Sequence, residues 1–319
     1  MPGRRIRVLY LGGIGRSGST LIERLLGEIP GVCAVGELVH LWGRGITEGE
    51  RCGCGEPFRL CPFWRQIGVA AFGGWDEVDV GHVAALRARV DRNRFIPLLA
   101  RRRDVPPGLR QTLTEYTAYY ARLYTAIAEV SGCQLIVDSS KHPSLAHCLR
   151  WQQDIDLRVL HVIRDSRAVA FSWSKHVRRP EADSESYMTR YSAAMAAGQW
   201  NAQNAVMHLL ARLGCPTIRM KYEDFATSPE EALHRIVGFA GLPEPDGYPF
   251  MGTTGESRWA QLNKIHTVSG NPMRFTTGKV QIRQDDRWRS DMSKAQRYTV
   301  TAITLPMLAG YGYVGSGHD

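Results

Sequence analysis

The sequence lacks any apolar stretch that approaches the roughly 20 residues of a membrane-spanning helix. Its N-terminus also lacks the charged and apolar regions of a secretory signal peptide, because a strand-like segment begins almost at once. We therefore expect a cytoplasmic protein with no transmembrane segment, in which most of the seven cysteines are reduced.

The usual signals of nucleic-acid binding are missing as well. There is no lysine-rich block and no zinc-finger spacing, although 40 Lys and Arg residues outnumber 31 Asp and Glu residues and give a formal net charge of +9. Such a balance favours a small anionic ligand over a nucleic acid. With 319 residues and 44% hydrophobic content, we expect a single domain over residues 1–319, with a cysteine-bearing insertion at about 40–110 and a basic C-terminal loop at about 264–290.

A phosphate-binding segment near the N-terminus organises the rest of the chain. Residues 8–11 are apolar, a glycine-rich turn follows, and Leu21, Leu25 and Leu26 recur at helical spacing. This order predicts a strand, a loop and a helix. Glycine lets the backbone approach an anion closely, and the first N–H groups of a helix direct partial positive charge at it.

The loop lacks the lysine of nucleoside-triphosphate sites. Gly13, four residues, Gly18 and then Ser19 and Thr20 reproduce the spacing of the nucleotide-triphosphatase loop, but serine stands where the lysine belongs. Arg16 supplies a cation from within the loop instead. Three alternatives remain at this point: a transferase that uses another nucleotide, a P-loop kinase with an unusual lysine donor, and a nucleotide-binding protein without a catalytic base.

With Arg16, Ser17, Gly18, Ser19 and Thr20 in this arrangement, the loop resembles that of the sulfotransferases that use 3′-phosphoadenosine 5′-phosphosulfate (PAPS). The resemblance is to the bacterial branch that acts on small molecules or carbohydrates, and it implies that these five residues bind PAPS. The product would be 3′,5′-adenosine bisphosphate, and no metal is expected.

A second motif strengthens the resemblance. Residues 157–163 predict a strand, and Arg164 and Ser172 after it, eight positions apart, match the family's pair of 3′-phosphate ligands. Tyr222, in a segment similar to the family's Tyr-Glu-Asp-Leu, is expected near the adenine, although a packed core tyrosine is almost as common at a strand end. Arg274 of the basic loop is expected to reach the 3′-phosphate, as a basic loop does in the family.

Two residues compete for the role of general base. Glu37 follows Gly36 after a predicted strand at 32–35, and in the branch that includes tyrosylprotein sulfotransferases a glutamate after a glycine has this role. His142 is the alternative, because a histidine follows the family's corresponding strand, here in the displaced pattern Ser-Lys-His. Lys141 beside it is expected to offset charge on the leaving phosphate.

Cys52, Cys54 and Cys61 form a cluster in the sequence. Zinc with His40 or Cys33 as a fourth ligand is one interpretation, but the spacing fits no standard pair of a structural zinc site. Packed thiols or a local disulfide are favoured, and similar cysteine-bearing inserts occur in bacterial sulfotransferase-like sequences.

The repeated order of strand, loop and helix predicts an α/β fold, a three-layer sandwich with a central parallel sheet and its site at the C-terminal edge. The function that this implies is transfer of a sulfuryl group from PAPS to a hydroxyl of a small-molecule, lipid or carbohydrate acceptor. The acceptor's identity does not follow from the sequence, and a homo-oligomer is compatible with it.

Overall fold

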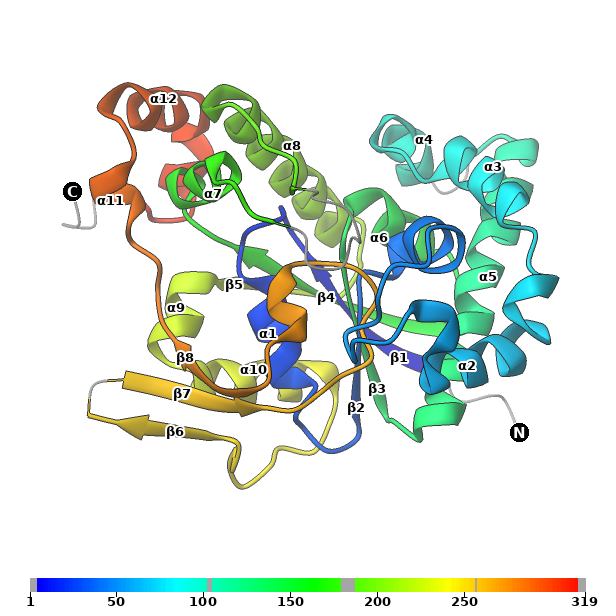
Figure 1. Cartoon of the computed structure of the whole chain (residues 1–319). Coiled ribbons are helices and arrows are strands. Elements are labelled where there is room, and N and C mark those ends of the chain that lie inside the picture. The colour runs from blue at the N-terminus through cyan, green and yellow to red at the C-terminus, as the bar shows by residue number, and fades with distance from the viewer. Residues whose placement is uncertain (1–4, 102–104, 179–186, 256, 315–319) are drawn as a thin grey trace.

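A five-stranded parallel sheet forms the centre of the molecule (Figure 1). The computed structural model describes residues 5–101, 105–178, 187–255 and 257–314. The strands lie in the order β2-β3-β1-β4-β5. Their bounds are β1 Ile6–Gly12, β2 Val32–Gly36, β3 Leu135–Lys141, β4 Ile155–Ile163 and β5 Thr217–Lys221.

Both faces of this sheet are buried, as expected for parallel strands connected by helices. Alternate residues of β1 point to opposite faces, so Val8 and Tyr10 join one core cluster while Leu9 and Leu11 join another. All four are 0% exposed. The near-continuous apolar character of the strand is therefore explained by two cores, one on each side.

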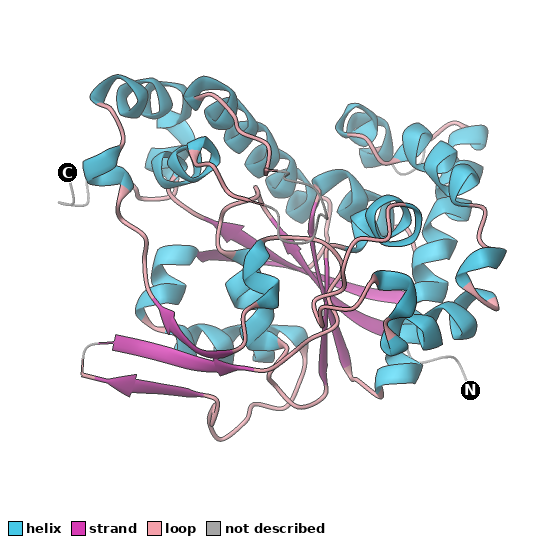
Figure 2. Ribbon diagram, in the orientation of Figure 1, coloured by secondary structure: helices cyan, strands magenta, loops and turns pink. Residues whose placement is uncertain are grey.

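Helices cover both faces, which confirms the predicted three-layer α/β fold (Figure 2). The helices of the first half are α1 Ser19–Leu26, α2 Pro62–Phe72, α3 Val80–Val90, α4 Ile96–Ala100, α5 Pro107–Ser131, α6 Pro143–Leu149 and α7 Ser166–Ser174. Those of the second half are α8 Ala193–Arg212, α9 Tyr222–Thr227, α10 Pro229–Ala240, α11 Trp288–Asp291 and α12 Lys294–Gly310. None of the helices in the described ranges is long and apolar enough to cross a membrane.

The helices divide between the two faces according to the core clusters. Residues of α2, α3, α5, α6 and α8 join the cluster that contains Val8 and Tyr10. Residues of α1, α9 and α10 join the other. The region predicted as an insertion contributes α2 and α3, which pack against α5, and α4, which packs against α6, at the right of Figure 1.

The basic C-terminal segment is more ordered than the sequence suggested. We expected an irregular loop there, but a second, antiparallel sheet of β6 Met251–Thr254, β7 Ser257–Leu262 and β8 Gly278–Ile282 includes part of it. Leu262 and Ile282 are buried in the core against α1 and α10, and Trp288 is 2% exposed. Part of the predicted basic C-terminal loop therefore contributes to the core.

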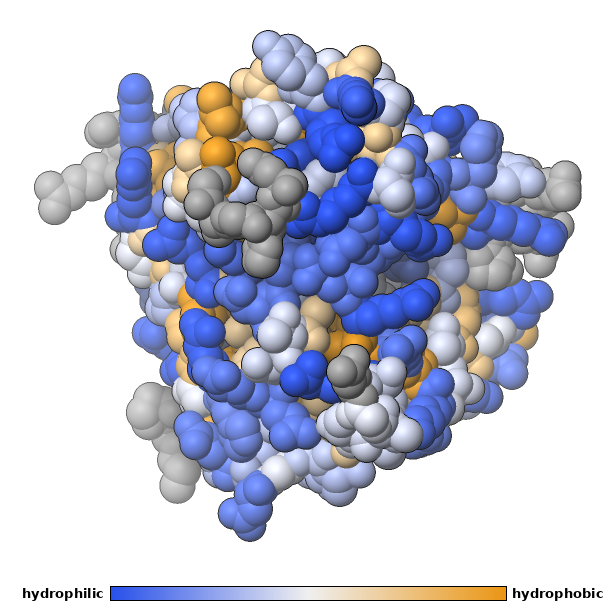
Figure 3. Space-filling model, turned by 90° about the vertical axis from the view of Figure 1, so that its left-hand side faces the viewer, coloured by the Kyte–Doolittle hydropathy of each residue, from blue (hydrophilic) through white to orange (hydrophobic). Residues whose placement is uncertain are grey.

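The surface turned toward the viewer in Figure 3 is mostly hydrophilic, with apolar residues in small separated patches. This distribution agrees with the basic composition and with a core that occupies both faces of the sheet.

Candidate functional site

A cavity of about 590 Å³ lies where the five parallel strands end. Each strand delivers a lining residue just beyond its carboxyl end or within its last position. These residues are Arg16 after β1, Glu37 after β2, Lys141 in β3, Arg164 after β4 and Tyr222 after β5. This is the expected location of a ligand site in an open α/β sheet, and the volume is that of a typical ligand pocket.

Glycine shapes the loop between β1 and α1 at two positions. Gly13 has a φ of 130°, and Gly18, the residue before α1, has a φ of 84°. A methyl group added at Gly18 would lie 2.1 Å from the ring of Tyr222. The aromatic ring therefore packs directly on the loop, and Ser19 and Thr20 line the cavity at the helix N-terminus.

Arg16 and Ser17 keep unused hydrogen-bonding capacity in this loop. Arg16 has the unusual φ of 74°, and its guanidinium lies 5.2 Å from the Trp173 ring centroid. Burial lowers the pKa of Arg16, although the negative charge of Glu37 acts in the opposite direction. Within the described residues, Arg16 Nε and Ser17 Oγ are buried without a hydrogen-bond partner. Ser17 is 1% exposed and, unlike its neighbours, is not part of the cavity lining.

Arg164 and Ser172 line the same cavity as the loop. The Arg164 guanidinium is 5.0 Å from the Tyr222 ring centroid, and its Nη1 donates to the Arg16 carbonyl over 3.1 Å. Arg164 is only 8% exposed. The two sequence motifs, separated by about 150 positions, therefore meet at one cavity that a single ligand can span.

Asp165 caps helix α7, which carries Ser172. The Asp165 carboxylate accepts from the Arg167 N–H over 2.8 Å. Ser166 is the first helical residue, and its hydroxyl bonds that of Thr304 at 2.8 Å. The Arg167 guanidinium also pairs with the Asp165 carboxylate at 2.8 Å.

Glu37 lies between two cationic or potentially cationic side chains in the cavity. Its Oε1 accepts from the Lys141 ammonium, and its Oε2 is 3.5 Å from His40 Nε2. Burial opposes ionisation of Glu37, but Lys141 and His40 outweigh it and hold the pKa of the carboxyl well below its usual range. Glu37 is therefore ionised at neutral pH.

His142 also lines the cavity and lies edge-on to His40, with ring centroids 5.5 Å apart. Burial lowers the pKa of His142 to about 4, and the charge of His40 acts in the same direction. At neutral pH His142 is accordingly uncharged. The structure thus brings both candidate bases to one wall of the cavity.

Backbone strain is concentrated around this cavity. In the described ranges, the non-glycine residues with positive φ are Arg16 at 74°, Lys141 at 66° and Ser269 at 51°. Arg16 and Lys141 line the cavity, and Ser269 accepts from the guanidinium of Arg44, which lines it too. Such strain persists where surrounding structure fixes it, and it is typical of functional sites.

Arg274 lies away from the cavity, contrary to its predicted role. It is 2% exposed, its Nη1 donates to the Thr267 carbonyl over 3.0 Å, and its Nη2 is 3.8 Å from Glu50. Arg283 of the same C-terminal segment lines the cavity instead. We therefore exclude Arg274 from the candidate site and include Arg283.

Sequence reasoning missed Arg44, Trp173 and Arg283, which all line the cavity. Trp173 directly follows Ser172, so its position in the second motif was a usable signal. Nothing in the local sequence distinguishes Arg44 or Arg283 from other surface arginines.

Three polar residues near the end of β3 are buried in the interior. Asp138, Ser139 and Ser140 are at most 1% exposed. Tyr124 donates its hydroxyl to Asp138 over 2.7 Å, and Ser140 accepts from the Val39 N–H over 2.9 Å. Burial raises the pKa of Asp138 to about 6. Of the three, only Ser140 contributes to the lining.

The lining is strongly cationic. Within the described part of the chain it contains one carboxylate, Glu37, and these basic side chains: Arg16, Arg44, Lys141, Arg164 and Arg283. Such a balance attracts a ligand with several negative charges.

The clustered cysteines lie outside this cavity. Cys52, Cys54 and Cys61 are free thiols and lie together with His266. His40 and Cys33, the fourth ligands considered from the sequence, do not belong to this group, because His40 faces Glu37 and Cys33 lies beside Cys133. The favoured local disulfide is absent among these described residues.

Comparison with known proteins gives a family match over nearly the whole chain. The model of the sulfotransferase domain matches residues 9–310. No curated protein matches.

Solved structures provide matches to the fold. A sulfotransferase domain from the curacin biosynthetic pathway has a TM-score of 0.52 at 13% identity and covers 97% of this chain and 98% of that one. A sulfotransferase domain from the Synechococcus PCC 7002 olefin synthase has a TM-score of 0.49 at 18% identity, covering 96% of each chain. At such identities the first match supports the fold alone.

Proposed function

This chain belongs to the sulfotransferase domain family and is a PAPS-dependent sulfotransferase. We propose that it transfers the sulfuryl group to a hydroxyl of a small-molecule, lipid or carbohydrate acceptor, by in-line attack assisted by a general base. The observation that carries the proposal is one cationic cavity, which is lined by four residues of the β1–α1 loop and helix start, by the pair Arg164 and Ser172, and by Glu37. The four residues are Arg16, Gly18, Ser19 and Thr20.

The donor would be held by residues that follow three strands, β1, β4 and β5. The unpartnered Ser17 hydroxyl and Arg16 Nε are donors that phosphate or sulfate oxygens accept, and the α1 N-terminus adds backbone N–H groups. We propose that Arg164 and Ser172 bind the 3′-phosphate and that Tyr222 contacts the adenine. Ser19, Thr20 and Gly18 complete the cradle.

Glu37 is the proposed general base. PAPS supplies the sulfuryl group: a new O–S bond forms to the acceptor oxygen, the S–O bond to the donor phosphate breaks, and adenosine bisphosphate leaves. Glu37 takes the proton of the attacking hydroxyl. Its low pKa makes it a weak base while Lys141 is paired with it, so an anionic donor that draws Lys141 away raises the pKa of Glu37 toward the useful range.

Lys141 and Arg16 are the proposed stabilisers of charge on the leaving side. Both are cations on the lining, and preorganised charges of this kind act where negative charge develops. His142 is the alternative base, because it is uncharged and lines the same wall.

Calorimetry with PAPS, adenosine bisphosphate and ATP tests the donor assignment. We expect tight binding of PAPS and the bisphosphate without added metal, because the cavity offers arginines in place of the P-loop lysine. Tighter binding of ATP with magnesium would favour a P-loop kinase.

Replacement of Glu37 by Gln tests the base. We expect turnover, measured as labelled-sulfate transfer to a panel of hydroxyl acceptors, to fall about 10²–10⁴-fold, the usual contribution of a general base. PAPS affinity by calorimetry should be nearly unchanged, since the variant keeps the shape of the side chain.

His142→Gln is the matched variant. An unaffected rate in Glu37→Gln together with a large loss in His142→Gln would assign the base to His142. Binding of PAPS without turnover on any acceptor in the wild type would favour a nucleotide-binding protein.

A further inference from the structure

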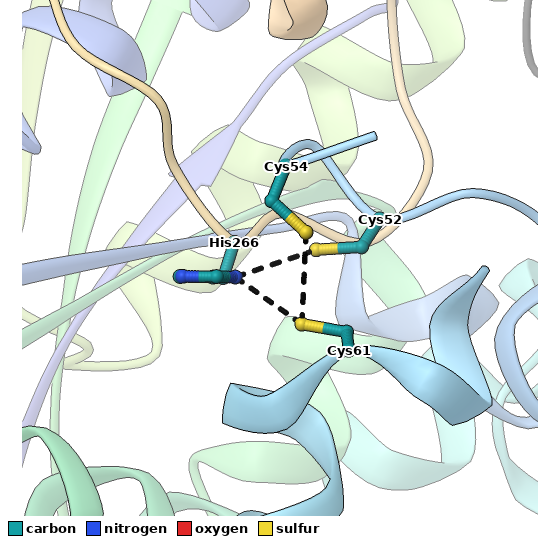
Figure 4. A group of neighbouring side chains, drawn as sticks. All are labelled: Cys52, Cys54, Cys61 and His266. Carbon is teal, nitrogen blue, oxygen red and sulfur yellow. Dashed lines mark hydrogen bonds between the residues drawn. The ribbon is translucent and has the colours of Figure 1, made fainter. Parts of the chain in front are cut away.

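Three thiols and one imidazole converge outside the cavity (Figure 4). We call Cys52, Cys54, Cys61 and His266 the Cys3His cluster. Its four potential ligand atoms lie within 4.8 Å of one another. His266 Nδ1 is 3.2 Å from the Cys61 sulfur and 3.8 Å from the Cys52 sulfur, and the Cys54 and Cys61 sulfurs are 3.8 Å apart.

These distances are those of a tetrahedral zinc site. With Zn–S of about 2.3 Å and Zn–N of about 2.05 Å, tetrahedral angles place two sulfurs about 3.8 Å apart and a sulfur and nitrogen about 3.6 Å apart. The measured sulfur–sulfur distance equals the first value, and the two sulfur–nitrogen distances lie on either side of the second. Three thiolates and one imidazole are also a common set of ligands for structural zinc.

The backbone around the Cys3His cluster holds its members in place. The Gly53 N–H donates to the Thr267 carbonyl over 2.9 Å, which ties the cysteine segment to the residue after His266. A methyl group on Gly53 would lie 2.4 Å from the Thr267 hydroxyl, so only glycine allows this approach. The His266 ring stacks on Phe63, with centroids 5.0 Å apart and an interplanar angle of 21°.

The position of Cys61 also favours a thiolate. Cys61 immediately precedes α2, where the partial positive charge of the helix N-terminus stabilises a negative sulfur. Cys52 and Cys61 are 0% exposed, which protects a bound ion from solvent.

We propose that the Cys3His cluster binds one zinc ion and that this ion has a structural role. Four protein ligands leave no open position for water or substrate, as in structural rather than catalytic sites. A disulfide would use two of the sulfurs and would leave the third sulfur and the imidazole without a role.

The ion would connect the cysteine segment to the wall of the catalytic cavity. Val268, two residues after His266, exchanges backbone hydrogen bonds with Val35 and Glu37 at 2.9 and 2.7 Å. Gly270 then packs beside Glu37, since a methyl group there would lie 3.2 Å from the carboxylate. Zinc at His266 therefore fixes the start of the segment that borders Glu37.

Elemental analysis of the full chain, purified without chelator and with any tag removed, tests the proposal directly. We expect one zinc per chain. Replacement of zinc by cobalt should give thiolate-to-cobalt charge-transfer bands and the intense visible bands of a tetrahedral site. Wild-type protein produced with ample zinc that contains no stoichiometric metal, and that gives no thiolate bands with cobalt, would overturn the proposal.

Variants identify the ligands independently of sulfotransferase activity. In the wild type, a chelator that removes the zinc should lower the melting temperature. Cys61→Ser should lose most of the zinc, and its melting temperature should no longer depend on the chelator. Cys215→Ser, a buried cysteine outside the cluster, should retain both.

His266→Cys should retain the ion, because four thiolates also form a structural site, and should strengthen the charge-transfer band of the cobalt form. It thereby tests the geometry even if Cys61→Ser does not fold. Full zinc content in Cys61→Ser, or an unchanged cobalt spectrum in His266→Cys, would contradict the assignment.

Discussion

At the scale of single residues, Lys141 controls the ionisation of Glu37. We predict that Lys141→Met raises the pKa of Glu37, because burial then acts on the carboxyl without the neighbouring ammonium. A base must be deprotonated, so activity is lost as pH falls through its pKa. In the wild type the acid limb of kcat/KM therefore lies at low pH, and in the variant it should move up by about one unit or more.

The pH profile of the residual activity in Lys141→Met also separates the two candidate bases. The low pKa of His142, about 4, arises from its burial and from the neighbouring His40. An acid limb that stays near pH 4 in the variant would therefore indicate His142.

Arg164 is the residue for which a conservative change should be costly. Its planar guanidinium lies on the Tyr222 ring and donates in two directions, to Arg16 and to the Asp285 carbonyl over 3.2 Å. We predict that Arg164→Lys raises the KM for PAPS about 10–100-fold, because an ammonium loses the bidentate and stacking geometry. Steady-state kinetics measure this.

Arg158→Lys is the matched control for Arg164→Lys. Arg158 lies in β4, the strand that Arg164 follows, but it is outside the cavity lining and donates to the Phe239 carbonyl. We expect its KM for PAPS to remain close to that of the wild type. Equal effects of the two changes would argue against a ligand role for Arg164.

At the scale of secondary-structure elements, Glu23 joins α1 to two strands. Its Oε1 accepts from the Gly36 N–H of β2 and its Oε2 from the Ser139 hydroxyl of β3, both over 2.6 Å. Burial raises the pKa of Glu23 to about 7, although these hydrogen bonds and the positive charge of Lys141 act to lower it. The neutral carboxyl is thus the form that the fold prefers.

This raised pKa makes stability depend on pH. The pKa of Glu23 is higher in the folded protein than in the unfolded chain. The contribution of Glu23 to the free energy of unfolding is therefore complete below about pH 4.5. It falls by about 3 kcal/mol in total as the pH rises toward 7. Glu23→Gln cannot ionise, so we predict that its free energy of unfolding, relative to that of the wild type, is higher at pH 8 than at pH 5. Urea unfolding of both proteins at the two pH values measures this change. The same difference between variant and wild type at pH 5 and at pH 8 would contradict the prediction.

The sequence predicted the elements whose patterns are local. The predicted strands at 8–11, 32–35 and 157–163 fall within β1, β2 and β4, because burial on both faces of the sheet produces an unbroken apolar pattern. The strands β6 to β8 were missed. They are short, and most of their residues are exposed or half-buried, so no apolar run distinguishes them from a loop.

The candidate site was predictable where it depends on strand ends and not where it depends on distant segments. Glu37, Lys141 and Arg164 each follow or end a strand, and parallel strands bring such residues together. The direction in which Arg274 points and the meeting of His266 with three cysteines depend on the path of the C-terminal segment, which spacing does not encode.

At the scale of the whole molecule, Arg24 connects helix α1, near the N-terminus, to the C-terminal segment at 263–274. It is 0% exposed, and its guanidinium donates to the carbonyls of Asn263, Met273 and Arg274 at 2.6 to 3.1 Å. We predict that Arg24→Met lowers the free energy of unfolding by about 3 kcal/mol or more, since buried carbonyls lose a charged donor.

Urea unfolding of Arg24→Met measures the loss, and Arg7→Met is its control. Arg7 makes one exposed hydrogen bond, to the Gly241 carbonyl, so its replacement should change stability by less than about 1 kcal/mol. A similar small change in Arg24→Met would show that this buried guanidinium does not hold the C-terminal segment.

The contact of Val268 with Val35 and Glu37 has a consequence for synthesis of the protein. During translation more than four fifths of the 319-residue chain leaves the ribosome before residue 268 does, so the surroundings of Glu37 are incomplete on the nascent chain. Termination just before residue 268 would leave the loop of Arg16 and the pair Arg164 and Ser172 in the polypeptide but would remove Val268 and Arg283, so we expect the truncated protein to be inactive.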